Sequence, residues 1–325
     1  MQPGAATAAV FAASWQCLAH VSQFARPGDY VAETVAGRPL IAVRGEDGTI
    51  RAFRNACRHR LSPFVDDGAG SCGRELTCPY HGWRYALDGR LKAATRFGPA
   101  DGFDAGALGL VALGVRLWRG WVFVGPAEGA PDFDAWIAPV ARRAAAVPME
   151  AWRFAARRTH EVACRWSVYV ENYLEGYHVP AIHPALDAEI VADDYRVTLE
   201  GRVAIHHAPL RPERAADAVY DGLWAWAWPN LGINVYRDGM MMERIWPLGE
   251  NRTRLDYLYV FADPDADHAA TFAMSDVVTA EDKAICEAVE RNMAAGDIAM
   301  GPLSPRHEGA VRLFRDLLAA APTPK

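Results

Sequence analysis

The amino-acid sequence predicts a two-domain α+β protein, in which an all-β domain precedes a domain that combines a large antiparallel sheet with helices. Residues 37–124 consist of short apolar stretches separated by turn signals, as is typical of a compact β domain. Residues 125–133 are rich in Pro and Gly and indicate a linker. Beyond residue 195 the chain alternates apolar and polar residues and then becomes helical, which favours an antiparallel sheet with covering helices.

The elements of the first domain follow from its turns. The stretches PLIAVR and IRAFRN flank GEDGT, and the Asp-Gly pairs at 47–48 and 88–89 are hairpin signals. Residues 118–124 predict a closing strand. Two short loops that carry Cys and His residues lie at one tip of this unit.

The second domain is predicted to begin with a helix over residues 134–146, followed by a strand that runs into a helix over 157–170. Its sheet is predicted from alternating stretches at 195–206, 223–236, 240–247 and 253–262. A final helix is expected over residues 275–294.

The composition limits the possible classes of protein. The 325 residues allow two domains, and 51% hydrophobic with 23% charged residues is ordinary for a globular protein. A formal net charge of −6 argues against bulk nucleic-acid binding. No segment has eighteen uninterrupted apolar residues, and the N-terminus lacks a basic region, so we expect neither a membrane span nor a signal peptide. Scattered cysteines favour the reducing cytoplasm.

The most informative residues are two Cys/His pairs, Cys57 with His59 and Cys78 with His81. Two thiolates and two imidazoles in this order are what a Rieske [2Fe–2S] centre needs, with two Cys on one iron and two His on the other. Tetrahedral zinc is the alternative, but zinc fingers usually pair Cys with Cys and His with His. Because each loop here carries one of each, the pattern favours the cluster.

A second metal site is predicted from His178 and His183. A Rieske cluster stores one electron and performs no oxygenation, so it needs an acceptor, and iron(II) held by two His and one carboxylate is the expected one. Pro180 and Pro184 predict a distorted helix end on which the two imidazoles converge. Asp282 is the candidate carboxylate, because it shares an apolar helical face with three residues. They are Val278, Ile285 and Val289.

The stretches NACRHRLSPF and LTCPYHGWRYALDGRL resemble the Rieske non-haem iron ring-hydroxylating oxygenase family, specifically its catalytic α subunit. The resemblance extends from Ser14 to about residue 309. Within the family, the chain is similar to the subtype that acts on glycine betaine, choline or carnitine. It implies a helix-grip (START-like) catalytic domain with the active site between sheet and helices. We expect an N-terminal segment at 1–36 that packs on the catalytic domain, the Rieske domain at 37–128 and the catalytic domain at 129–325.

The resemblance also implies roles for single residues. The family's EDxxxCExVQ-like pattern places its carboxylate ligand at Asp282, and this chain has Glu290 where that pattern commonly has Gln. Glu175 is expected to fix the tautomer of His178 and to connect it, across a subunit interface, to His81 of the next protomer. Such a bridge requires a cyclic assembly, so a homotrimer is expected. Leu61, where relatives often have Gly, is expected to alter a loop conformation without affecting ligation.

The wall of the substrate pocket is predicted less directly. Three tryptophans alternate along one predicted strand, and this arrangement indicates either a cation–π cage or a packed aromatic core. Asn172, beside the two histidines, is a further candidate catalytic residue. The pocket candidates are Trp224, Trp226, Trp228, Asn230, Asn234 and Tyr236.

These observations predict an oxygenase that uses O₂ to hydroxylate or demethylate a small organic substrate, with a quaternary ammonium compound as the candidate class. No dinucleotide-binding fingerprint is present, so NAD(P)H acts through a separate flavin- or ferredoxin-type reductase. The alternatives are cis-dihydroxylation of an aromatic ring and a Rieske electron carrier that lacks the second iron site. Iron content separates the carrier, with two irons per chain, from the oxygenase, with three.

Overall fold

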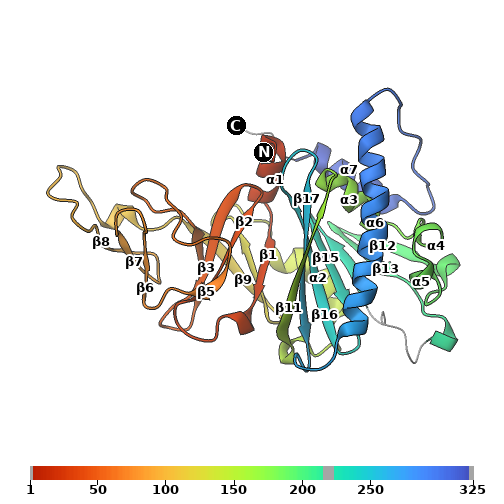
Figure 1. Ribbon diagram of the computed structural model, residues 1–325, viewed down its shortest axis with the longest axis horizontal. Helices are drawn as coiled ribbons and strands as arrows, with labels where there is room; N and C mark the ends of the chain where they lie inside the picture. Colours follow the sequence, from red (N-terminus) through yellow and green to blue (C-terminus); the bar gives the residue numbers. More distant parts are fainter. Residues whose placement is uncertain (1–2, 215–222, 322–325) are drawn as a thin grey trace. The chain divides into compact units, whose positions relative to one another are not determined.

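The computed structural model describes residues 3–214 and 223–321, which group into two compact units. Phe11–Pro131 form the first, called here the β unit, and the residues on either side of it form the second, called the α+β unit. Figure 1 shows the strands of the β unit in red to yellow, and the sheet of the α+β unit in green to blue. No helix within the described ranges is both long and apolar enough to cross a membrane.

The β unit is built from two sheets of antiparallel strands, as predicted. Among the described residues the larger sheet has seven strands in the order β1-β10-β9-β4-β3-β2-β5, and β6, β7 and β8 form a smaller one. The strands are β1 (Gln16–His20), β2 (Asp29–Val35), β3 (Arg38–Arg44), β4 (Ile50–Arg54), β5 (Gly68–Ser71), β6 (Glu75–Thr77), β7 (Arg84–Ala86), β8 (Leu91–Ala93), β9 (Ala112–Trp118) and β10 (Trp121–Gly125).

The Asp-Gly turns lie where they were predicted. Gly48 and Gly89 have φ angles of 78° and 91° and connect β3 to β4 and β7 to β8. The expected single strand over 118–124 is wrong, because Arg119 and Gly120 both have positive φ and reverse the chain between β9 and β10. Positive φ at both central residues matches the twist of a tight hairpin.

The N-terminal segment is divided differently from the expectation. β1 pairs with β10, and β2 pairs with both β3 and β5, so residues 16–35 belong to the β unit. Only the residues before Phe11 group with the α+β unit. All five residues of β1 are buried, so β1 lacks the alternation that marks a strand in the sequence.

The α+β unit is built around one antiparallel sheet, as predicted. Its seven described strands have the order β11-β17-β16-β15-β14-β13-β12. The strands are β11 (Arg153–Val162), β12 (Arg196–Glu200), β13 (Val203–His207), β14 (Trp224–Ala227), β15 (Leu231–Val235), β16 (Gly239–Pro247) and β17 (Thr253–Phe261). The helices are α1 (Ala5–Ala12), α2 (Phe133–Arg143), α3 (Trp166–Tyr173), α4 (Val179–Ile182), α5 (Pro184–Asp187), α6 (Ala269–Ala295) and α7 (Gly309–Ala319).

Two alternating stretches proved to be pairs of strands. Residues 195–206 span β12 and the start of β13, and residues 223–236 span β14 and β15. The cis peptide bond between Trp228 and Pro229 lies in the turn that separates β14 from β15. Trp228 therefore lies beyond the strand that holds Trp224 and Trp226.

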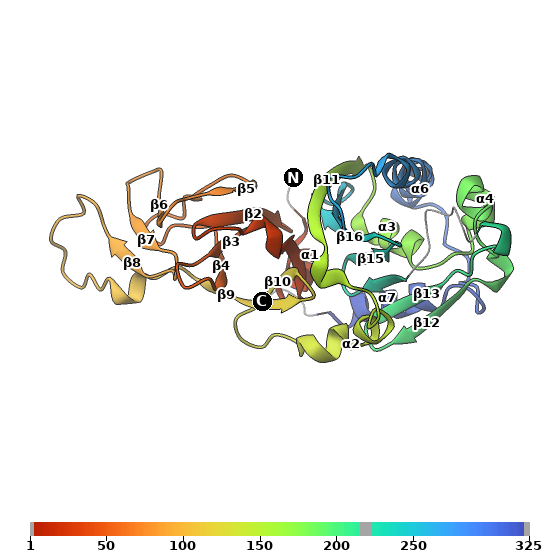
Figure 2. The ribbon, with the colours of Figure 1, turned by 90° about the horizontal axis from the view of Figure 1, so that it is seen from below.

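Helices α3 and α6 lie on the same side of β15 and β16 (Figure 2). Glu290 of α6 is buried and accepts hydrogen bonds from Arg165, directly before α3, through its backbone N–H at 2.9 Å, Nε at 3.0 Å and Nη2 at 2.8 Å. This ion pair joins the start of α3 to the C-terminal half of α6. It gives Glu290 a structural role that the sequence did not indicate.

We expect Glu290→Ala to lower the free energy of unfolding by about 2 kcal/mol, because it removes three hydrogen bonds and leaves the Arg165 guanidinium without its partner. Chemical denaturation measures the change. Lys283→Ala is the control on the same helix, since its ammonium lies 3.8 Å from Glu287 in an exposed pair and should contribute less than about 0.5 kcal/mol. Equal losses in both variants would contradict this role.

Candidate metal centres and active site

The two Cys/His loops share one backbone arrangement. The N–H of Leu61 donates to the carbonyl of Cys57 at 2.8 Å, and the N–H of Gly82 donates to the carbonyl of Cys78 at 3.0 Å. Leu61 and Gly82 have φ angles of 59° and 69°. Two equivalent loops facing one point are the arrangement expected of a cluster held between them.

The expectation that Leu61 alters its loop is not supported by this comparison. Leu61 adopts the left-handed conformation that glycine favours, at a cost of about 1 kcal/mol. Its side chain is 72% exposed, so it clashes with no core residue. The two loops therefore remain equivalent although one carries leucine and the other glycine.

The four side chains at the loop tips fit a Rieske cluster. Cys57 and Cys78 are buried in the core of the β unit, and burial raises the pKa of the Cys57 thiol. The rings of His59 and His81 lie 4.5 Å apart between centroids, and His59 stacks on Trp83 at 4.8 Å. The Nδ1 atom of His59 is buried without a hydrogen-bond partner, which is costly unless it binds a metal. Two thiols and two imidazoles are thus placed for a [2Fe–2S] centre.

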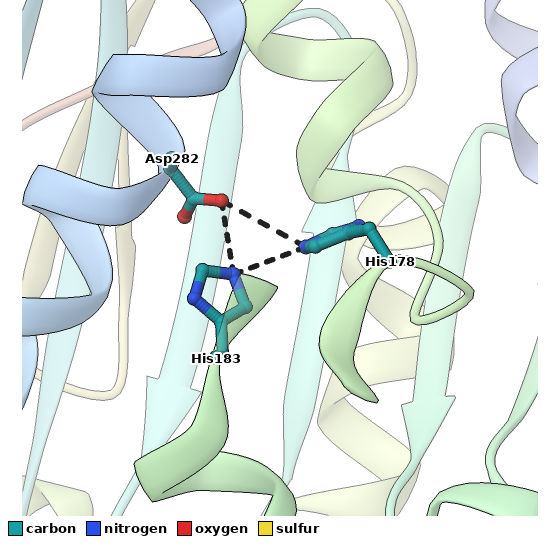
Figure 3. Close-up of side chains that lie close together, drawn as sticks. All are labelled: His178, His183 and Asp282. Carbon is teal, nitrogen blue, oxygen red and sulfur yellow. Dashed lines mark hydrogen bonds and ion pairs between the residues drawn. The ribbon is translucent and has the colours of Figure 1, made fainter. Parts of the chain in front are cut away.

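His178, His183 and Asp282 come together as a second candidate metal site (Figure 3). The Nε2 atoms of the two imidazoles are 3.1 Å apart. Oδ1 of Asp282 lies 3.0 Å from Nε2 of His183 and 3.7 Å from Nε2 of His178. Two imidazoles and one carboxylate on one side of a metal form the set that leaves positions open in non-haem iron(II) oxygenases.

The backbone around the two histidines is a broken helix, as the prolines predicted. α3 ends at Tyr173, and His178 and His183 flank the single turn of α4. Pro180 lies in the first turn of α4, where its missing N–H costs little. Residues 174–178 form a turn, although the three-residue spacing of Glu175 and His178 would also place them on one face of a continuous helix. The contact between them is made by that turn.

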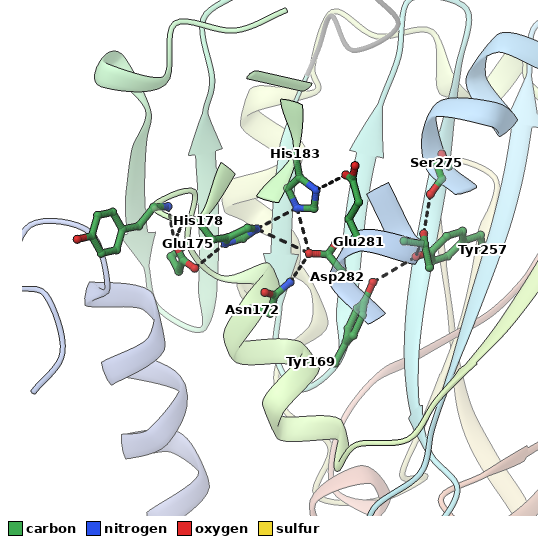
Figure 4. Close-up of polar contacts among 11 residues, drawn as sticks. Tyr169, Asn172, Glu175, His178, His183, Tyr257, Ser275, Glu281 and Asp282 are labelled. Atoms are coloured by element: carbon green, nitrogen blue, oxygen red, sulfur yellow. Dashed lines mark hydrogen bonds and ion pairs between the residues drawn. The ribbon is translucent and has the colours of Figure 1, made fainter. Parts of the chain in front are cut away.

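Each histidine donates its Nδ1 proton to a carboxylate, which leaves Nε2 free for a metal (Figure 4). Nδ1 of His178 lies 2.6 Å from Oε1 of Glu175, and Nδ1 of His183 lies 2.7 Å from Oε2 of Glu281. Carboxylates in this position fix the tautomer of a ligand histidine and increase its basicity. The second oxygen of Glu175 accepts the backbone N–H groups of Tyr177 and His178.

Asn172 positions the third ligand. Its Nδ2 donates to Oδ1 of Asp282 at 2.6 Å, so α3 fixes the carboxylate that α6 carries. The predicted candidate therefore contacts the metal-binding triad through Asp282.

Asp282 lies on the buried face of α6, but that face differs from the apolar one predicted. Val289 is 40% exposed, so the buried face of the helix is rotated relative to the face predicted from Val278, Ile285 and Val289. The side chains on the buried face are mostly polar. They are Ser275, Thr279, Asp282, Cys286 and Glu290.

The charges around the triad shift two pKa values. Burial lowers the pKa of His183, but hydrogen bonds and charges from Asp282 and Glu281 outweigh it and raise the pKa overall. Burial, with the charge of Asp282, raises the pKa of Glu243 to about 8. The negative charge of Asp282 contributes to both shifts, and burial is the larger cause for Glu243.

A cavity of about 110 Å³ adjoins the triad. Strands β13 to β17 and helices α3 to α6 contribute to its lining, so it lies between sheet and helices as the family resemblance implied. Six of the twenty described lining residues are tyrosine or tryptophan: Tyr169, Tyr173, Tyr195, Trp224, Tyr236 and Tyr257. Gly232 leaves room for Tyr173, because a Cβ there would lie 3.0 Å from its ring.

The predicted pocket residues divide into two groups. Trp224, Asn234 and Tyr236 line the cavity. Trp226 and Trp228 pack instead on Phe314 of α7, with ring centroids 5.7 Å and 5.9 Å away. They form the packed core that was the alternative interpretation.

Asn230 is also absent from the described lining, because its side chain donates to the carbonyl of Ile245 at 3.1 Å. Sequence reasoning missed Glu243 and His206, which line the cavity, and Glu281. An acid within the stretch GMMMERIWP, in which every residue is buried, was the available signal for Glu243. The Nδ1 atom of His206 lies 2.7 Å from the Tyr195 hydroxyl.

Comparison with known families agrees with this geometry. Residues 14–104 match the Rieske [2Fe–2S] domain, and residues 149–321 match the catalytic domain of the ring-hydroxylating alpha subunit. The chain therefore belongs to the ring-hydroxylating oxygenase alpha-subunit family. It is a Rieske non-haem iron oxygenase, with a [2Fe–2S] domain and a mononuclear iron site at His178, His183 and Asp282.

Several characterised proteins are similar to this chain. The carnitine monooxygenase oxygenase subunit of Escherichia coli K12 is 29% identical over 87% of this chain and 79% of its own. Chloroplastic choline monooxygenase of Arabidopsis thaliana is 29% identical over 87% and 72%. The solved structure of a quaternary ammonium Rieske monooxygenase, described for carnitine oxidation and inter-subunit electron transfer, has a TM-score of 0.85 at 26% identity, over 97% of this chain and 91% of its own.

We expect His178→Ala to remove the mononuclear iron and all turnover while the visible absorption of the cluster remains, because the two metal sites use separate residues. Cys57→Ser should do the reverse and abolish the visible absorption. Iron analysis and paramagnetic resonance of the reduced proteins measure both losses. A Rieske signal that persists in Cys57→Ser, or that disappears in His178→Ala, would contradict the ligand assignment.

Proposed function

We propose that the protein is a monooxygenase that hydroxylates or demethylates a quaternary ammonium compound. The observation that carries the proposal is the aromatic lining of the cavity beside the triad. A quaternary ammonium group donates no hydrogen bonds, and aromatic faces attract it through cation–π interactions. The names of the similar carnitine and choline monooxygenases support the same class of substrate.

The chain's own residues orient both partners of the reaction. When bound, the cluster supplies single electrons and the mononuclear iron supplies O₂ activation. Glu175 and Glu281 hold the proton on Nδ1 of each ligand histidine, and Asn172 holds Asp282. The cavity holds the substrate beside the triad and excludes water from it.

Electrons are proposed to come from NAD(P)H through a separate reductase chain. None of the six cysteines forms a disulfide, which supports the expected cytoplasmic setting. A test of the whole proposal combines the iron-loaded protein with a surrogate reductase, NADH and a panel of choline, γ-butyrobetaine, glycine betaine and benzoate. Oxygen uptake with an oxidised or demethylated ammonium product is expected. Turnover of benzoate to a cis-diol, with every ammonium compound unreacted, would overturn it.

We further propose that Glu175 transfers electrons between subunits of a homotrimer. Its carboxylate already holds His178, and His81 on the β unit is exposed and so available to a neighbouring copy. A cyclic trimer would bring His81 of one copy to Glu175 of the next. Sedimentation equilibrium measures the assembly, and full activity as a monomer would exclude it.

Glu175→Gln is expected to keep both metals and the trimer yet slow single-turnover product formation by orders of magnitude. The amide loses the charge-assisted hydrogen bonds that a carboxylate makes to both imidazoles. Reduction of the cluster by the reductase, followed by its absorption, should stay fast.

Glu281→Gln is the matched control, because it changes the carboxylate of the other ligand histidine without touching the proposed bridge. With the iron site filled, its rate of electron delivery should stay within a few-fold of the parent. Equal slowing in the two variants would assign the effect to the iron site and reject the bridge.

A further inference from the structure

Glu243 is a buried acid that faces the cavity and has a free oxygen. It lies on β16, opposite Tyr257 on β17, and only 4% of its surface is exposed. The hydroxyls of Tyr169 and Tyr257 stabilise its ionised form. Its Oε1 is buried without a hydrogen-bond partner among the described residues.

Within the described lining of the cavity, no lysine or arginine compensates this acid. None of the residues described as lining the cavity is a lysine or an arginine. Arg244 follows Glu243 in the chain, but strand alternation turns it to the opposite face, where it pairs with Asp256 at 3.3 Å. Burying an unpaired carboxylate is costly, and the pKa of Glu243 is raised because burial disfavours its charged form.

The metal does not supply the missing positive charge. Asp282, Glu175 and Glu281 all contact the ligand set, so three carboxylates already face the two positive charges of iron(II). A cation that occupies the cavity would therefore pair with Glu243 and favour its ionised form over the protonated form.

We propose that Glu243 is the specificity-determining counter-ion for the substrate's ammonium group, and that the cavity selects alkylammonium cations without a carboxylate over zwitterionic betaines. This inference rests on the proposed function. A carboxylate carried by the substrate would find acids and no lysine or arginine among the described lining residues. A monocation of the choline type pairs with Glu243 and leaves no charge of its own unpaired.

The test is calorimetric binding to the iron-loaded protein with three probes: choline, its neutral isostere 3,3-dimethylbutan-1-ol, and γ-butyrobetaine. We expect choline to bind at least about tenfold more tightly than either of the others, because only choline forms the buried charge pair without adding a carboxylate. In Glu243→Gln the preference of choline over its neutral isostere should fall to about one. Unchanged cluster absorption and iron content show that the variant is folded.

Glu189→Gln is the matched control, since Glu189 is equally buried but does not line the cavity, and it should keep the preference for choline. An unchanged preference in Glu243→Gln would overturn the inference. If that variant does not fold, the unmodified protein decides: γ-butyrobetaine binding as tightly as choline would also overturn it. Absence of both binding and turnover for every ammonium probe would instead refute the proposed function.

Discussion

The iron site depends on where two protons are held. An imidazole binds a metal only through a nitrogen that carries no proton, so the other nitrogen must keep it. Glu175 and Glu281 accept those protons at Nδ1 of His178 and His183, and both Nε2 atoms consequently face Asp282. Much of the local backbone serves this arrangement: α3 ends before Glu175, α4 is a single turn, and consecutive residues of α6 reach opposite sides of one imidazole ring.

A buried helix face made of polar residues requires a partner for each polar group, and α6 satisfies this requirement through the sheet and α3. The Thr279 hydroxyl lies 2.8 Å from that of Tyr257, Asp282 accepts from Asn172, and Glu290 pairs with Arg165. These three contacts, spaced along the helix, fix its rotation about its own axis and its position along that axis. Asp282 is therefore held by regular elements, which is how a metal ligand is kept in place before the metal binds.

The sequence predicted the residues whose chemistry is local and missed those that depend on long-range register. Cys57 and His59 lie in a short loop where spacing indicates ligation, His178 was predicted because the cluster needs an acceptor, and the alternating stretches predicted the sheet. The contact of Glu281 with His183 spans 98 residues, and Glu243 faces the cavity only because of how β16 pairs with β15 and β17. The tryptophans were assigned to one strand because the turn at Trp228 was not recognised.

The sheet separates opposite charges between its two faces. On one face Asp256 is surrounded by arginines on β11, β16 and β17, so its charge is compensated within the protein and its pKa lies below the usual value despite burial. On the other face the pKa of Glu243 is raised instead, because the described lining residues include acids but no lysine or arginine. Folding alone leaves this face with an uncompensated electrostatic cost. A cation that bound there would offset this cost and stabilise the folded chain by mass action, so the excess of acids that we propose makes the site selective would also couple its occupancy to stability.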